Sequence, residues 1–243
     1  LTVINKTTQS VSLNHDKIID INQLDFNDKK VFDLFASGQT IGVFQFESNG
    51  MREYLKKLKP TSIEDLIAMN ALYRPGPMQN IPEFISRKQG NSKITFLHPK
   101  LESILKETYG IIVYQEQVME ICQTIGGFSL AQGDTIRRAM GKKKADLMTA
   151  FKVDFVDGAI KQNIDKKIAV EIFELLEKFT EYGFNKSHAT AYALIAYQTA
   201  WLKTYYPSEF LAENMNTEIN DINRIVTLIN EARDRNIDVE APD

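Results

Sequence analysis

Residues 183–205 read GFNKSHATAYALIAYQTAWLKTY, and this stretch decides the fold. Its first part is a polar loop that ends in Ser187 and His188, and the remainder is an unbroken run of good helix formers that stops before Pro207. A serine just before such a run is a favoured helix N-cap. The stretch therefore predicts a long helix from Ser187 to about residue 205, with Ser187 as its cap.

Helix signals also dominate the segments on either side. Asp28 is placed to cap an amphipathic helix over residues 29–37, which Gly38 would end. Ser129 and Gln132 have the spacing of a capping box, in which each side chain accepts a hydrogen bond from the other residue's backbone. These signals predict a chain built mainly of α-helices.

Two short segments have strand-like patterns instead. Residues 40–47 alternate in polarity, and residues 110–114 are rich in β-branched side chains. We therefore predict a mostly α, compact multi-helix domain with one or two short strand pairs. We expect it to divide into a leading segment (residues 1–30), a core that carries the functional motifs (31–207) and a helical extension (208–243).

Composition limits the class of protein. The chain has 243 residues, 43% of them hydrophobic, with a formal net charge of −3 and a pI near 5.8, so bulk charge does not favour nucleic acid and any contact with it needs a local patch. The single cysteine, Cys122, excludes an internal disulfide framework and, with no apolar run of membrane-spanning length, indicates a cytoplasmic protein without a membrane partner. Because the chain begins at Leu1 rather than at methionine, we expect it to be a piece of a longer protein.

The densest charge cluster is residues 137–144, which read RRAMGKKK. It holds five cations in eight positions: Arg137, Arg138, Lys142, Lys143 and Lys144. Cations near the end of a helix also complement its dipole, which is the simpler explanation for the two arginines taken alone. Five cations this close repel one another, however, and guanidinium groups bind phosphate oxygens in pairs. The cluster therefore predicts a phosphate-binding site.

The loop before the long helix is a second candidate anion site, because free amide groups at a helix start bind phosphate. Its polar residues are Asn185, Lys186, Ser187 and His188. A capped helix and a partly buried histidine explain the same residues without a ligand, although capping and binding use the same amide groups. Tyr192, farther along, could stack on a base, although aromatic helix faces are more often core. Two such sites in one chain indicate that it binds a polyanion.

Several chemistries have no motif here. The sequence lacks a phosphate-binding P-loop, a zinc-binding H-E-x-x-H and any pair of aspartates two residues apart, which is the usual arrangement for holding two Mg²⁺ ions. We therefore predict phosphate-binding groups without a metal site and without catalytic residues in these 243 positions. Two other functions remain open: a helical adaptor that binds an acidic protein, and a non-catalytic module that binds single-stranded DNA.

The motifs together resemble one family. GVFQFES (42–48), ALYRPGP (71–77), YGIIVYQEQVM (109–119), RRAMGKKK (137–144) and YGFNKSHATAYALIAYQTAWLK (182–203) occur in the order seen in the C-family replicative DNA polymerases, the alpha subunits of bacterial DNA polymerase III. The resemblance covers nearly the whole chain and is weakest over the first and last thirty residues. It implies a fingers domain that follows the palm domain and closes over the incoming deoxynucleoside triphosphate (dNTP).

The resemblance also implies roles for residues. Arg137 and Arg138 would bind the triphosphate, and the loop Asn185, Lys186, Ser187 and His188 would lie against its sugar and phosphates, with His188 where a ribose 2′-hydroxyl would clash. The less certain contacts, to template DNA or to the same cleft, are Arg74, Tyr114, Gln115, Lys142, Lys143, Lys144 and Tyr192.

The catalytic groups of the family lie elsewhere. Its Mg²⁺-binding aspartates belong to the palm, so the resemblance implies that this piece alone is inactive although the whole enzyme is a DNA-directed DNA polymerase. The expected partners are dNTP and primer–template DNA, and the other replisome subunits would bind outside these residues.

Overall fold

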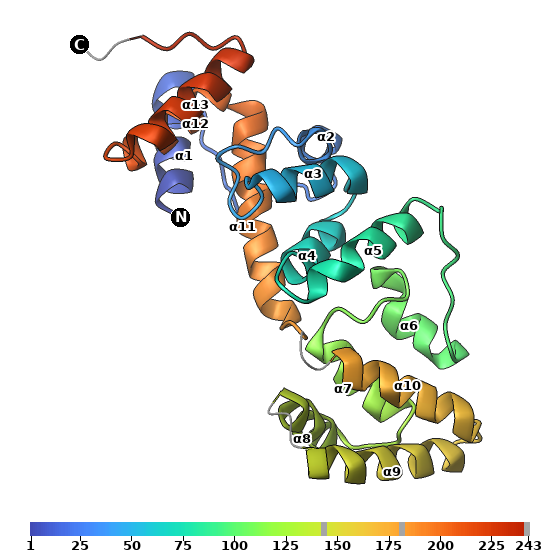
Figure 1. Cartoon of the computed structure of the whole chain (residues 1–243). Coiled ribbons are helices and arrows are strands. Elements are labelled where there is room, and N and C mark those ends of the chain that lie inside the picture. Colours follow the sequence, from blue (N-terminus) through green and yellow to red (C-terminus); the bar gives the residue numbers. More distant parts are fainter. Residues whose placement is uncertain (142–144, 180–182, 241–243) are drawn as a thin grey trace. The chain divides into compact units, whose positions relative to one another are not determined.

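A computed structural model of the chain describes residues 1–141, 145–179 and 183–240, and the predicted contacts Lys142, Lys143 and Lys144 lie outside these ranges. The side chains of residues 140, 141 and 145–147 are also not described. The regular structure in the described ranges is helical (Figure 1). It comprises α1 (Thr2–His15), α2 (Lys29–Ser37), α3 (Asn49–Leu58), α4 (Ile63–Leu72), η1 (Pro77–Asn80), α5 (Ile81–Lys88), η2 (Pro99–Leu101), α6 (Glu102–Leu105), η3 (Lys106–Thr108), α7 (Gln115–Thr124), α8 (Leu130–Gly141), α9 (Ala145–Lys161), α10 (Lys166–Phe179), α11 (Lys186–Tyr205), α12 (Pro207–Thr217) and α13 (Ile222–Asp234), where η marks a 3-10 helix. The mostly α prediction is confirmed.

The predicted strand pairs are wrong. Within the described ranges the only extended pairing is an isolated parallel bridge between Tyr114 and Phe184. Residues 40–47 fold as consecutive turns, in which the Thr40 hydroxyl donates to the Phe46 carbonyl at 2.6 Å and Gly42 takes a φ of 80°. The buried residues here are Thr40, Val43 and Phe46, which is every third position rather than every second, and turns satisfy the backbone without a partner strand.

Several helix boundaries follow the predicted caps. The Asp28 carboxylate accepts from the Lys30 amide at 2.9 Å and α2 ends at Gly38 in the left-handed conformation. The Ser129 hydroxyl accepts from the Gln132 amide at 3.3 Å, and the Gln132 side chain accepts from the Ser129 amide at 2.9 Å, so the predicted capping box opens α8. In the described ranges, no helix combines the length and apolar composition needed to cross a bilayer.

The chain forms two compact units, and both boundaries fall within helices, α4 and α11. One unit comprises Leu1–Leu66 and Thr190–Asp243, the other Ile67–Ala189. The predicted division at residues 30 and 207 is a different one: α1, from the leading segment, packs against α12, from the extension, and α12 packs against α13 (Figure 1). The core of this unit joins Ile4, Leu202, Phe210, Leu211, Leu228 and Ala232.

The second unit, Ile67–Ala189, carries the motifs of interest. Helix α7 packs against α8, α8 against α9, and α9 against α10 (Figure 1). Their shared core includes Ile121, Ile136, Phe155, Phe173 and Leu176. Cys122 lies in the same core, where burial raises the pKa of its thiol to about 12, so it is a packing residue rather than a nucleophile.

A buried lysine joins three segments of the first unit. Lys203, on α11, is 0% exposed, and its ammonium group donates to the carbonyls of Gln39 at 2.8 Å and Ile41 at 2.6 Å. It also pairs with Glu231 of α13 at 2.7 Å. Burial lowers the pKa of Lys203 from 10.5 to about 8, although Glu231 acts in the opposite direction.

This shift predicts a pH dependence. Between about pH 8 and pH 10.5 the unfolded chain keeps the proton that the folded chain releases, so the contribution of Lys203 to the free energy of unfolding rises with pH. The pKa values of Cys122 and Tyr197 are raised, so their contributions to the free energy of unfolding fall at high pH. The contribution of Lys203 is therefore isolated by comparing the wild-type chain with the variant Lys203→Met. In urea titrations, the difference in stability between the wild-type chain and Lys203→Met is expected to grow by about 1.5 kcal/mol between pH 8 and 9.5. A difference that stays constant or shrinks would contradict the assignment.

Candidate nucleotide-binding site

The two arginines of the charge cluster share one carboxylate. Arg137 donates to Asp134 through Nε at 3.0 Å and through Nη2 at 2.8 Å, and Arg138 pairs with the other oxygen of Asp134 at 2.8 Å. These residues are three and four positions apart on α8, where side chains face one another. The hydrogen bond from Arg137, ahead of the charges of both arginines, lowers the pKa of the Asp134 carboxyl below its ordinary value. Asp134 therefore relieves part of the repulsion between the two arginines from within the same helix.

Gln115 connects Arg137 to the loop before α11. The Arg137 guanidinium donates through Nη1 to the Gln115 side-chain oxygen at 3.0 Å, and the Gln115 side-chain nitrogen donates to the Gly183 carbonyl at 3.0 Å. The Gln115 backbone amide also donates to the Phe184 carbonyl at 2.9 Å. One side chain thus brings together two motifs that lie more than forty positions apart in the sequence.

The start of α11 differs from the prediction by two residues. The Asn185 side-chain oxygen accepts from the His188 amide at 2.8 Å, so Asn185 is the N-cap and the predicted Ser187 cap is wrong. Asparagine and serine are equally good caps, and the bridge at Phe184 fixes the chain so that Asn185 takes the position. Ser187 and His188 lie in the first turn and are exposed, and the His188 ring contacts the Phe184 ring edge-on at 5.4 Å.

Two carboxylates hold this loop. Glu116, in the first turn of α7, accepts from the Asn185 side-chain amide at 2.8 Å and from the Lys186 backbone amide at 3.1 and 3.0 Å. Glu107 pairs with the Lys186 ammonium group at 2.6 Å. The amino end of α11 therefore already has an anion against it, and Asp134, Glu107 and Glu116 offset much of the positive charge of this region.

Arg74 and Tyr114 lie against the same loop. The Arg74 guanidinium stacks over the Phe184 ring at 4.1 Å, and burial lowers the pKa of Arg74 below its ordinary value. Tyr114 is only 2% exposed, with the Lys186 ammonium group 5.4 Å from its ring. Arg74 and Tyr114 fix Phe184 and Lys186, so the loop is rigidly supported from within the unit.

Comparisons with known proteins place the chain in a family. Residues 1–163 match the family model described as the bacterial DNA polymerase III alpha subunit finger domain. The chain belongs to this finger-domain family. A DNA polymerase III subunit alpha of Borreliella burgdorferi is 56% identical over 92% of the chain, and those of Caulobacter vibrioides and Campylobacter jejuni are 52% and 50% identical over 93% and 100% of it. The chain spans about a fifth of the length of these relatives, between 19% and 20%.

The finger-domain chain brings only some predicted residues together. Arg74, Gln115, Arg137, Asn185 and Lys186 belong to one network of contacts, and Arg138 joins it through Asp134. Tyr192 lies in the other unit, where its ring packs against Phe44 at 5.3 Å. Within the described ranges, no group of three His, Cys, Asp or Glu side chains is placed to hold a metal ion.

Three important residues were absent from the prediction. Asp134 had a usable signal, because it precedes the arginines by three and four residues on a helix. Glu116 and Glu107 had none, since they contact Lys186, which lies 70 and 79 positions later. The sequence revealed the cations of the site but not the anions that hold them.

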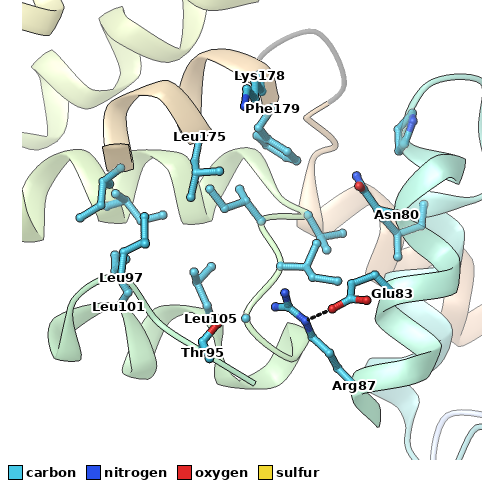
Figure 2. A pocket seen from close by; sticks show the side chains of 18 of the residues that line it. Asn80, Glu83, Arg87, Thr95, Leu97, Leu101, Leu105, Leu175, Lys178 and Phe179 are labelled. Carbon is cyan, nitrogen blue, oxygen red and sulfur yellow. Dashed lines mark hydrogen bonds and ion pairs between the residues drawn. The ribbon is translucent and has the colours of Figure 1, made fainter. Parts of the chain in front are cut away.

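An apolar cavity of about 490 Å³ lies in the same unit but elsewhere (Figure 2). Leu97, Leu101, Leu105, Leu175 and Phe179 are among its lining residues, and the Arg87–Glu83 ion pair, 2.7 Å long, lies at its side. The described lining contains none of the residues predicted to bind nucleotide. A triphosphate needs charge rather than apolar enclosure, so we place the candidate site on the polar surface of α7, α8 and the start of α11.

Proposed function

We propose that this chain is the part of a replicative bacterial DNA polymerase that binds the triphosphate and sugar of the incoming dNTP. The observation that carries this proposal is the chain of contacts from Arg137 through Gln115 to Gly183, at 3.0 Å each. It makes the arginines of α8 and the amino end of α11 a single surface. Family membership supports the proposal, because relatives that match the chain are named as alpha subunits of DNA polymerase III.

Each residue has a distinct role in this proposal. Arg137 and Arg138 bind phosphate oxygens, and Lys186 adds a point charge near them. Ser187 and His188, which are exposed in the first turn of α11, face the sugar, with His188 disfavouring a 2′-hydroxyl. Arg74, Tyr114 and Gln115 support the loop, and Lys142, Lys143 and Lys144, which lie outside the described residues, are proposed contacts to template DNA.

The chemistry needs positioning and charge neutralisation from this chain. Negative charge builds on the β-phosphate as pyrophosphate leaves, and guanidinium groups already in place stabilise it without reorganisation. Two Mg²⁺ ions, held by carboxylates outside these residues, would supply the activation of the primer 3′-hydroxyl. The chain alone is therefore expected to be inactive, and the complete enzyme to act on primer–template DNA in the cytoplasm with replisome partners bound elsewhere.

Nucleotide binding by the 243-residue chain tests the proposal directly. We expect weak dATP binding whose affinity falls roughly fourfold or more between 50 and 200 mM NaCl, because phosphate contacts with cations release counterions. Isothermal calorimetry or ³¹P NMR would measure it. The double variant Arg137→Ala/Arg138→Ala should abolish the binding, while Lys161→Ala, which removes an exposed cation from α9, should leave it unchanged.

Other outcomes would favour the rival functions. Equal binding by the double variant would remove the arginines from the site. Nanomolar binding of a single-stranded oligonucleotide without Mg²⁺ would indicate a DNA-binding module instead. Nucleotide incorporation by the purified chain would contradict the expectation that its catalytic groups lie elsewhere.

A further inference from the structure

A carboxylate lies against the amino end of α11, which belongs to the surface that the proposed function assigns to the dNTP. The two oxygens of Glu116 accept from the Lys186 backbone amide at 3.1 and 3.0 Å, and one of them also accepts from Asn185 Nδ2 at 2.8 Å. A carboxylate and a phosphate are alike in being anions that only accept hydrogen bonds. Glu116 therefore uses donors that a bound triphosphate would also use.

Helix capping alone does not explain this arrangement. The Asn185 side-chain oxygen already caps α11 through the His188 amide at 2.8 Å. The Lys186 ammonium group pairs with Glu107 at 2.6 Å, so that positive charge is held by another acid. What Glu116 adds is a negative charge against the amino end of α11, where the helix dipole attracts anions.

We infer that Glu116 is an internal competitor of the incoming nucleotide. Its carboxylate accepts from the donors at the amino end of α11 and must be displaced before a phosphate oxygen binds there, so Glu116 lowers the nucleotide affinity. This inference rests on the proposed function. It means that an acidic residue weakens nucleotide binding. The cationic motifs alone do not predict such an effect.

The contacts around Glu116 allow it to leave without dismantling the site. Gln115, its neighbour, holds Arg137 at 3.0 Å and Gly183 at 3.0 Å through its own side chain, and the loop is also fixed by the Gln115 amide on Phe184 at 2.9 Å. Asn185 keeps its capping bond through a different atom from the one bonded to Glu116. Exchange of one anion for another therefore costs neither the cap nor the Arg137 contact.

The decisive variant is Glu116→Gln in a full-length alpha subunit that carries these residues. Glutamine keeps an oxygen that accepts from the Lys186 amide but removes the charge. In steady-state primer extension, the KM for dATP is expected to fall about three- to tenfold, with kcat changed by less than twofold. In the 243-residue chain, ³¹P NMR should show tripolyphosphate binding tighter by a similar factor.

The control is Glu120→Gln, which removes an exposed carboxylate one turn farther along α7. It should leave the KM for dATP within twofold of the wild-type value, which separates local competition from a general change in charge. Thermal unfolding of both variants checks the fold.

A higher KM, an unchanged KM, or a lower kcat for Glu116→Gln would overturn the inference and leave Glu116 as a residue that only supports the loop before α11. Arg137→Ala/Arg138→Ala in the same assay separates the two ideas. If that variant loses activity while Glu116→Gln changes nothing, only the competition is wrong. If neither variant matters, the nucleotide binds elsewhere and the proposed function fails.

Discussion

Arg137→Ala in a full-length alpha subunit that carries this chain is expected to lower kcat/KM for dNTP by a factor of 10² to 10³, about 2.7–4 kcal/mol of transition-state stabilisation. The side chain is 30% exposed and is held by two bonds to Asp134 and one to Gln115. Because the guanidinium is fixed before substrate arrives, its charge is available without the cost of ordering it. Steady-state incorporation of a single dNTP, with kcat and KM measured separately, checks the prediction.

The pattern of loss distinguishes this role from a structural one. An arginine that neutralises charge on the leaving group should affect kcat at least as strongly as KM. Arg137→Lys should recover only part of the loss, because an ammonium group cannot reproduce the planar fork that contacts Asp134 and Gln115 together. Lys161→Ala serves as the control for loss of a cation in the same unit. A loss below fivefold for Arg137→Ala would contradict the assignment.

Pairing of the arginines with Asp134 changes how the charge cluster should be interpreted. Arg137 and Arg138 do not form a bare cationic patch, because one carboxylate bonds to both. Electrostatic attraction to unpaired cations therefore contributes less to triphosphate binding than the sequence suggests. A larger part of the binding free energy comes from phosphate oxygens that replace the contacts between Asp134 and the two arginines. Glu116 likewise occupies hydrogen-bond donors at the amino end of α11 that a phosphate would otherwise use.

The sequence predicted the elements that are specified locally. Asp28 and the Ser129–Gln132 pair bond to residues within three positions, and their signals located the starts of α2 and α8. The prediction of Ser187 as the N-cap was wrong because Asn185, two residues earlier, is an equally good cap. Which of the two caps α11 depends on Phe184, which bridges to Tyr114. The strand prediction for residues 40–47 was wrong because the alternating polarity of the sequence did not correspond to alternating burial: the buried residues are Thr40, Val43 and Phe46, and the segment folds as turns.

The site was predictable only in part for the same reason. Arg137 and Arg138 are adjacent in the sequence and were predicted, whereas Glu116 and Glu107 approach Lys186 from 70 and 79 positions away. Tertiary contacts of this kind leave no periodic signal. The geometry of the candidate site therefore came from the fold, whereas the sequence indicated only its cationic groups.

Lys203→Met is expected to lower the free energy of unfolding of the 243-residue chain by about 3–5 kcal/mol. Methionine fills a similar volume but leaves the carbonyls of Gln39 and Ile41 without the ammonium group that they accept from at 2.8 and 2.6 Å. It also leaves Glu231, which is 5% exposed, with the single ion pair to Arg235 at 2.8 Å. Urea unfolding monitored by circular dichroism measures the change.

Two further variants separate burial from charge as the cause. Lys29→Met removes an exposed lysine that pairs with Asp33 on α2, and it should cost less than about 0.5 kcal/mol because water replaces the partner. Lys203→Met/Glu231→Met should recover part of the single-variant loss, because no buried carboxylate is then left with reduced compensation. The recovery of the free energy of unfolding stays incomplete, since the carbonyls of Gln39 and Ile41 still lack their donor. A loss for Lys203→Met as small as that for Lys29→Met would show that the buried ammonium group does not hold α11, α13 and residues 39–41 together.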